Sequence, residues 1–132
     1  MMRAVLRIFL IASLAATGCR ETKPQASPDT RHNLNVPAHA REVKVAEKLK
    51  RRRIGIVEQF LIGEPGVVVD GSRVRIHGSR GGPLWVIDGM YTDTPGGLNP
   101  YDVFKMWIVA DGFGYGRRGS NGVVVVETKV GQ

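Results

Sequence analysis

The sequence has little cysteine and no long apolar run, and each shortage excludes a class of protein. A single cysteine, Cys19, stands among 132 residues, so no disulfide can form within the chain. No apolar run reaches the ~18 residues that a membrane-spanning helix needs. A chain of 132 residues has room for one small domain, which excludes a multidomain enzyme.

Glycine and proline are plentiful by contrast. The chain has 17 Gly and 7 Pro, and most of the glycines follow residue 60. Because these residues form tight turns, the later part of the chain is predicted to contain short strands joined by turns. The same composition argues against an all-helical bundle.

The first residues have the composition of a secretory signal. Arg3 and Arg7 give a positive start, and residues 8–16 form an apolar stretch that is too short to span a membrane. Small residues then lead directly to Cys19. This arrangement resembles the bacterial lipobox, with Ala16 in place of the usual Leu, and we therefore predict a lipoprotein signal peptide over residues 1–18.

The lipobox resemblance implies a lipid anchor. Lipid would be attached to the thiol of Cys19, and several acyl chains would hold the protein on the membrane. Arg20 follows where an Asp would signal retention at the inner membrane, so the resemblance implies the outer membrane, on its periplasmic face. The alternative is a soluble secreted protein with a free thiol.

Two polar segments follow the cysteine. Residues 19–40 are rich in proline and small polar side chains and poor in apolar ones, which predicts a disordered tether. Residues 41–53 carry seven basic and two acidic side chains. In this basic helix or linker, Val43, Ala46 and Leu49 are spaced by three, which predicts one narrow apolar helical face.

The basic segment favours an anionic partner. Without the signal peptide, 17 basic and 12 acidic side chains leave a charge of +5. Clustered Lys and Arg bind phosphates, but export argues against nucleic acid and favours lipid headgroups or lipopolysaccharide. A solvated helix that only keeps the protein soluble is the alternative reading.

Residues 54–132 are predicted to form one α/β domain. Continuous apolar runs such as Val123 to Val126 predict strands that are buried on both faces and need covering helices, for which residues 56–61 and 100–102 are the candidates. The predicted fold is a small mixed β-sheet of about four to five short strands with one or two helices. The β-branched runs expected to form strands are residues 67–69, 74–76, 84–87, 106–109 and 123–128.

Five phrases of this domain read, in order, LIGEPGV, VRIHG, PLWVIDGM, LNPYD and YGRRGSNGVVVVETK. Their order and spacing resemble the plug domain of TonB-dependent outer-membrane receptors of the glycan-importer (SusC-like) subgroup. By residue type, the matching positions are expected to shape the backbone rather than to touch a ligand. These plug-motif positions are Pro65, Gly66, Val74, Arg75, Gly78, Leu84, Val86, Asp88, Gly89, Asn99, Pro100, Tyr115, Gly116, Gly119, Asn121 and Gly122.

The resemblance also implies a function and partners. Receptors of that family carry a barrel of roughly 22 strands around the plug, for which this chain has no room, and no TonB box stands out in the sequence. The implied protein is a plug-like binding or accessory component of TonB-dependent nutrient transport. Its implied partners are outer-membrane lipid and a separate TonB-dependent receptor or surface glycan-binding lipoprotein. The alternative is a stand-alone protein-interaction or carbohydrate-binding lipoprotein unrelated to transport.

No constellation in the sequence indicates catalysis. Residues 114–119 satisfy the spacing G-x-G-x-x-G, but a strand is predicted after them instead of the helix that dinucleotide binding requires. His32, His39 and His77 share no metal-ligand spacing. We therefore predict a protein that is not an enzyme and has no cofactor; a small enzyme with an unseen site is a further alternative.

A set of arginine and aromatic side chains forms a candidate contact surface. Such residues are typical of surfaces that bind proteins or glycans. The alternative is that the tryptophans belong to the core and that the arginines are merely solvated. The candidate residues are Arg80, Trp85, Tyr91, Arg117 and Arg118.

Overall fold

The computed structural model describes residues 34–130. The predicted signal peptide, Cys19 and most of the predicted tether therefore lie outside the described residues. None of the helices within residues 34–130 is long and apolar enough to cross a membrane.

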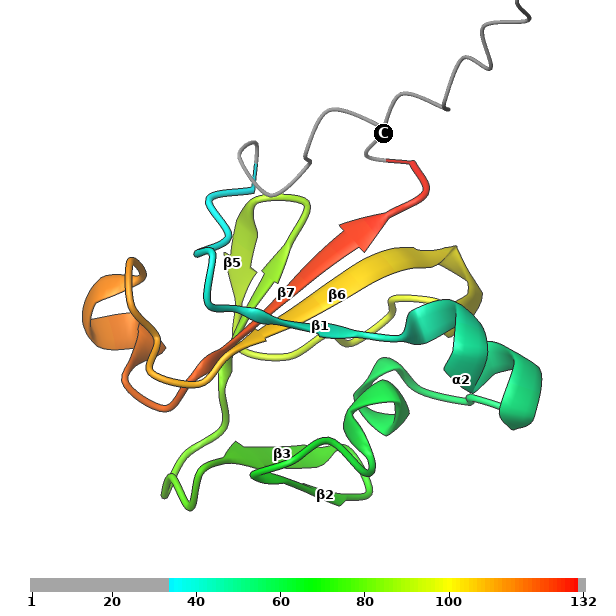
Figure 1. Cartoon of the computed structure of the whole chain (residues 1–132), viewed down its shortest axis with the longest axis horizontal. Helices are drawn as coiled ribbons and strands as arrows, with labels where there is room; N and C mark the ends of the chain where they lie inside the picture. Colours follow the sequence, from blue (N-terminus) through cyan, green and yellow to red (C-terminus); the bar gives the residue numbers. More distant parts are fainter. Residues whose placement is uncertain (1–33, 131–132) are drawn as a thin grey trace, which may run out of the picture.

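The chain folds into a mixed five-stranded sheet with a separate hairpin beneath it (Figure 1). The order of strands in the large sheet is β1-β6-β7-β4-β5, and the parallel pair in it is β4 with β7. The hairpin consists of β2 and β3. The elements are β1 (Arg41–Val43), α2 (Val45–Arg51), η1 (Val57–Leu61), β2 (Val67–Asp70), β3 (Arg73–Ile76), β4 (Leu84–Ile87), β5 (Met90–Thr92), η2 (Pro100–Asp102), β6 (Val103–Val109), η3 (Gly116–Gly119) and β7 (Val123–Thr128).

This architecture confirms the predicted fold class, a small α/β domain with a mixed sheet of about four to five strands, but the predicted strands at 67–69 and 74–76 form the separate β2–β3 hairpin. The predicted runs 84–87 and 123–128 coincide with β4 and β7. The predicted helices at 56–61 and 100–102 are the short 3-10 helices η1 and η2. The strands β1 and β5 at the two edges of the sheet were not predicted.

The central strand β7 is buried on both faces, as predicted. Val124 and Val126 pack into a core with side chains of α2, η1 and β3. Val123 and Val125 pack on the opposite face, where the cover differs from the prediction. No helix of the described chain covers that face; residues 34–40 and the loop that carries Tyr115 pack against it instead.

The ordered fold starts earlier than the predicted boundary at Ile54. Strand β1 pairs with β6 in antiparallel register, and Val43 and Val45 are buried in the core. The inward face of α2 consists of Val45 and Leu49, whereas Ala46 is exposed, so the predicted helical face is wrong by one position. Because Val43 belongs to β1, it cannot contribute to a helical stripe.

Two pairs of residues at the ends of strands have different roles. Asp88 and Gly89, with φ of 48° and 86°, form the two-residue hairpin turn between β4 and β5. Asn121–Gly122 is not a two-residue hairpin turn, because residues 110–122, which include η3, separate β6 from its antiparallel partner β7. Gly122 is the last residue before β7. Its φ is 88°, and it lies close to the side chain of Ile76.

Gly112 provides a test of this packing. Its φ is 63°, and a Cβ atom there would overlap the backbone carbonyl of Gly119. We expect Gly112→Ala to lower the free energy of unfolding by about 3 kcal/mol or more, since left-handed strain and a backbone clash add together. The measurement is urea denaturation followed by circular dichroism.

Gly71→Ala is the matched control. Gly71 has a φ of 60°, but a Cβ atom there would meet nothing within 4 Å. The free energy of unfolding of this variant should fall by only about 1–2 kcal/mol, which is the cost of placing alanine in the left-handed conformation. Equal losses for the two variants would contradict the close approach of Gly112 to Gly119.

Candidate contact surface

Side chains from two distant segments of the chain meet at the edge strand β5. The rings of Tyr91 and Tyr115 pack edge to face, with centroids 6.2 Å apart. The guanidinium carbon of Arg118 lies 5.8 Å from the centroid of the Tyr91 ring, on the η3 side. Arg118 also forms an ion pair with Asp93, at 3.7 Å. We call Tyr91, Asp93, Tyr115 and Arg118 the tyrosine–arginine cluster.

A buried side chain holds the loop that carries Tyr115 against residues 34–40. The Tyr115 side chain is buried, and its hydroxyl donates a hydrogen bond of 3.0 Å to the carbonyl of Asn35. Burial, and to a lesser extent the nearby Tyr91, raises the pKa of the Tyr115 hydroxyl, which therefore stays protonated. Gly112 and Gly119 approach each other within the same loop. The partly exposed members Tyr91 and Arg118 thus rest on a rigid base.

A second exposed group lies next to this loop. The Nε2 atom of His39 is 3.1 Å from Oδ1 of Asp111, and the His39 ring packs edge to face against Phe113, at 6.2 Å. The backbone N–H of Phe113 and then the His39 side chain lower the pKa of Asp111. Phe113 is 71% exposed, so this group adds an apolar side chain to the surface without burying it.

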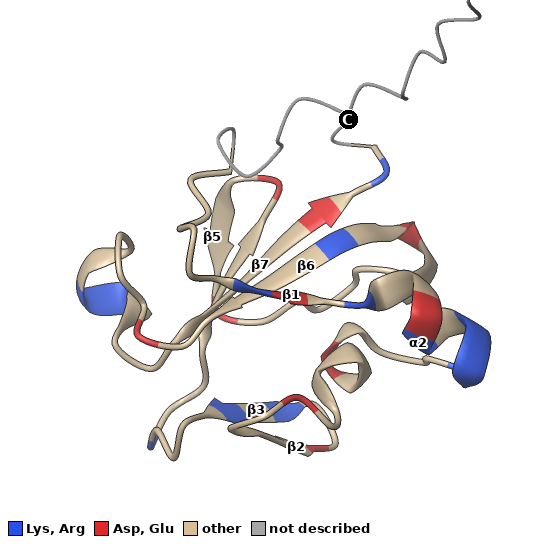
Figure 2. Ribbon diagram, in the orientation of Figure 1, with Lys and Arg blue, Asp and Glu red and all other residues tan. Residues whose placement is uncertain are grey.

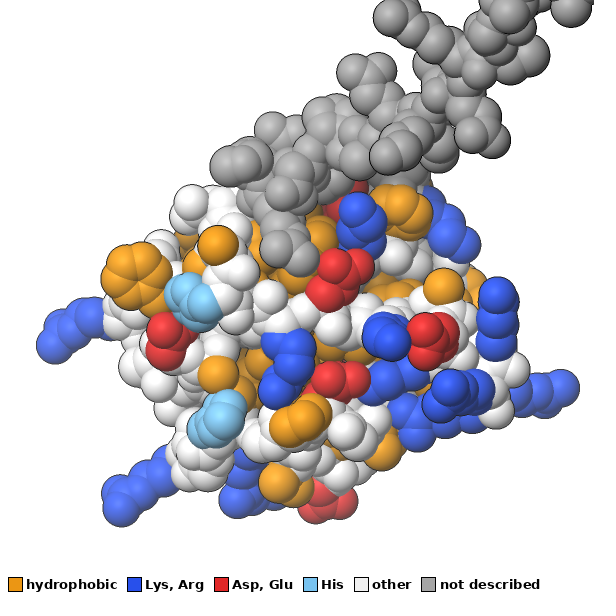
Figure 3. Space-filling model, in the orientation of Figure 1, with side chains coloured by type: hydrophobic (Ala, Val, Ile, Leu, Met, Phe, Trp, Pro, Cys, Tyr) orange, Lys and Arg blue, Asp and Glu red, His pale blue; other side chains and the backbone are white. Residues whose placement is uncertain are grey.

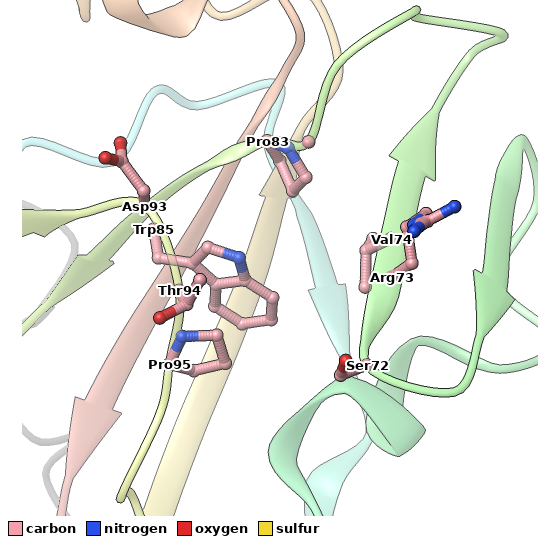
Figure 4. A pocket seen from close by; sticks show the side chains of 9 residues that line it. Ser72, Arg73, Val74, Pro83, Trp85, Asp93, Thr94 and Pro95 are labelled. Carbon is pink, nitrogen blue, oxygen red and sulfur yellow. The ribbon is translucent and has the colours of Figure 1, made fainter.

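A small pocket of about 170 Å³ opens between the β2–β3 hairpin and the loop after β5 (Figure 4). Trp85 and Pro95 lie on one side of it, and Ser72 and Val74 lie on the other. The carboxylate of Asp93 points away from the pocket. A pocket for a drug-sized ligand measures about 300–1,000 Å³. The pocket is therefore too small to be a ligand site of that kind.

The structure separates the predicted contact residues. Tyr91 and Arg118 meet, as described above, but Trp85 is only 2% exposed and belongs to the core. Arg80 is exposed on the loop after β3, and Arg117 is exposed on η3. Asp93 was missed by the sequence analysis, because its pairing with Arg118 spans 25 residues and leaves no local pattern.

Several plug-motif positions hold the ends of the sheet together. Asp88 accepts hydrogen bonds from the backbone N–H and the hydroxyl of Thr128, at 2.8 and 2.6 Å, and so links the β4–β5 turn to the end of β7. The side chain of Asn99 accepts a hydrogen bond from the N–H of Tyr101 at the start of η2. The buried plug-motif positions are Val74, Leu84, Val86, Pro100, Tyr115, Gly119 and Gly122.

The exposed plug-motif positions lie mostly in turns. Pro65 accepts a hydrogen bond from Arg41 through its carbonyl, at 2.7 Å. The turn glycines Gly66, Gly78, Gly89 and Gly116 have positive φ. Arg75 extends outward from β3. Within residues 34–130, no group of three or more His, Cys, Asp and Glu side chains is arranged to hold a metal ion.

Comparison with known proteins relates the chain to receptors. No protein-family model matches it. TonB-dependent receptor P26 of Formosa agariphila is 34% identical over 99 residues, which cover 67% of this chain and 10% of the receptor. TonB-dependent receptor P39 of the same organism is 33% identical over 87 residues, or 61% of this chain and 8% of the receptor.

A solved structure supports the same relationship. A chain in the structure of the RagAB peptide importer in the 'open-open' state matches with a TM-score of 0.55 and 31% identity, over 68% of this chain and 12% of that chain. The chain spans only about a tenth of the length of these relatives. It is therefore related in sequence and in fold to a segment of TonB-dependent receptors.

One buried carboxylate lies at the end of the sheet. Glu127 on β7 is 2% exposed, and its Oε2 atom has no hydrogen-bond partner among the described residues. Burial raises the pKa of the Glu127 carboxyl, Lys105 opposite it on β6 partly lowers it, and Asp88 adds to the increase. A raised pKa in the folded state means that folding favours the protonated carboxyl.

We expect Glu127→Gln to increase the free energy of unfolding at neutral pH. The cost of the buried charge is present above the raised folded-state pKa and disappears as the pH falls below the ordinary value of 4.5. The gain of the variant over the wild type should therefore shrink between pH 7 and pH 4, measured by urea denaturation. Glu47→Gln, at an exposed carboxylate, is the control and should give no gain. A gain for Glu127→Gln that is independent of pH would contradict this account.

Proposed function

We propose that the chain is a lipid-anchored, non-enzymatic plug-like protein of the outer membrane that acts as an accessory component of receptor-mediated nutrient uptake. The relationship to a segment of TonB-dependent receptors carries this proposal. The predicted signal peptide and Cys19, which lie outside the described residues, supply the anchor. A separate TonB-dependent receptor, or a surface glycan-binding lipoprotein beside it, is the proposed partner.

The tyrosine–arginine cluster is the proposed contact point. Tyrosine and arginine are enriched among the residues that contribute most to binding at protein interfaces. Tyr91 and Arg118 are partly exposed, whereas Tyr115 beneath them is fixed to Asn35. Little side-chain freedom is therefore lost when a partner covers them.

The second candidate function is a protein-interaction or carbohydrate-binding lipoprotein unrelated to transport. The exposed ring of Tyr91, flanked by Arg118 and Asp93, favours it, since a sugar ring can stack on tyrosine while charged groups bind its hydroxyls. A glycan array probed with the purified chain separates this function from the first.

The lipid anchor can be tested by Cys19→Ser. The serine hydroxyl cannot form the thioether, so we expect loss of labelled palmitate incorporation and release of the protein into the soluble periplasmic fraction. Measurement is by metabolic labelling and membrane fractionation of cells expressing the full chain. A variant that is still labelled and still sediments with the outer membrane would refute lipid attachment at Cys19.

The contact point can be tested by Arg118→Ala. An exposed ion pair contributes about 0–1 kcal/mol to stability, so the variant should remain folded. If Arg118 anchors a partner, recovery of a TonB-dependent receptor from solubilised outer membranes should fall about tenfold. The control is Arg80→Ala, which also removes an exposed arginine but lies outside the cluster. Equal recovery with both variants would contradict the assignment, and repeated absence of any receptor with the wild type would contradict the transport proposal.

A further inference from the structure

The excess positive charge of the described chain is confined to one segment. Residues 41–53 contain seven basic and two acidic side chains, a net charge of +5, whereas residues 54–130 contain seven basic and eight acidic ones, a net charge of −1. The segment folds into β1, α2 and the two residues after the helix. Figure 2 shows the resulting concentration of basic residues at the α2 end of the domain.

Part of this charge is used within the fold. Lys48 donates hydrogen bonds to the carbonyls of Phe60 and Ile62, and its ammonium group is paired with Glu64. Arg52 donates to the carbonyl of Gln59, at 2.6 Å. These contacts attach α2 to η1, so the remaining cations of the segment are held on a structured element rather than on a loose chain.

Four other cations of the segment point outward. Lys44 and Arg51 are 73% and 79% exposed and share the single carboxylate of Glu47, at 3.5 and 3.9 Å. Lys50 and Arg53 are exposed and make no hydrogen bond or ion pair with any other residue between 34 and 130. We call Lys44, Lys50, Arg51 and Arg53 the basic surface. It extends from the body in the space-filling view (Figure 3).

Two isoleucines near this segment are exposed. Ile56 follows Arg53 by three residues and is 38% exposed, and Ile62, whose carbonyl accepts from Lys48, is 42% exposed. Cations next to exposed apolar side chains suit a lipid interface, where ammonium and guanidinium groups contact phosphates and apolar groups enter the headgroup region. Binding to phosphate alone would not involve the exposed isoleucines.

We propose that the basic surface docks the domain on an anionic phospholipid membrane. Each Lys or Arg close to an anionic lipid surface increases partition onto it roughly fivefold. The four cations of the basic surface therefore give docking that is weak alone and reversible by salt. Docking would fix the orientation of the domain on the membrane, with α2 toward the lipid. This proposal does not depend on lipid attachment or on a receptor partner.

The test uses the full chain carrying Cys19→Ser, so that no acyl chain contributes to binding. Sedimentation is measured with vesicles of phosphatidylcholine mixed with phosphatidylglycerol, and with vesicles of phosphatidylcholine alone. We expect binding to the anionic vesicles only, and loss of that binding at high salt. The triple variant Lys50→Gln, Arg51→Gln and Arg53→Gln should bind about 100-fold more weakly.

The matched control removes the same charge from another face. The triple variant Arg73→Gln, Arg75→Gln and Arg80→Gln lowers the net charge equally but leaves the basic surface unchanged. It should retain most of the binding. Equal losses in the two triple variants would overturn the proposal in favour of a general charge effect. Equal binding to neutral vesicles, or binding to duplex DNA without binding to anionic vesicles, would also overturn it.

Discussion

Both faces of β7 must be kept from water, because Val123 to Val126 place two valine side chains on each side of the sheet. One face is covered by α2, η1 and the β2–β3 hairpin. The other depends on residues 34–40 and on the loop held by Tyr115, which bonds to Asn35. The tyrosine–arginine cluster is built on that loop, so the candidate contact point and the cover of the sheet are parts of one arrangement.

The sequence patterns predicted the strands with continuous β-branched runs, β4 and β7, to the residue. They missed β1 and β5, because three-residue edge strands with charged or exposed side chains have no apolar pattern. The contact surface was predicted less well. Trp85 is a core residue, and the approach of Arg118 to Tyr91 and Asp93 results from the chain path, which a pattern of residue types does not record.

The relationship to TonB-dependent receptors covers a small part of those proteins, and it bears on fold more than on activity. The residues shared with the plug motif are used here to close turns and to link strand ends, as Asp88 does for Thr128. Function is proposed from three further features: a predicted lipid anchor at Cys19, the tyrosine–arginine cluster and the basic surface at α2. The three would act together by holding the domain at the membrane and presenting the cluster to a partner.

Amide hydrogen exchange of the purified full chain, without a receptor, tests most directly whether this sheet is a self-sufficient core. The account predicts that the amides of Val123 to Val126 and of Met106 to Val109 exchange most slowly, with opening free energies close to that of global unfolding. Residues 36–40 should also be protected, because they cover one face. Rapid exchange throughout β6 and β7, slowed only when a receptor is added, would contradict the account.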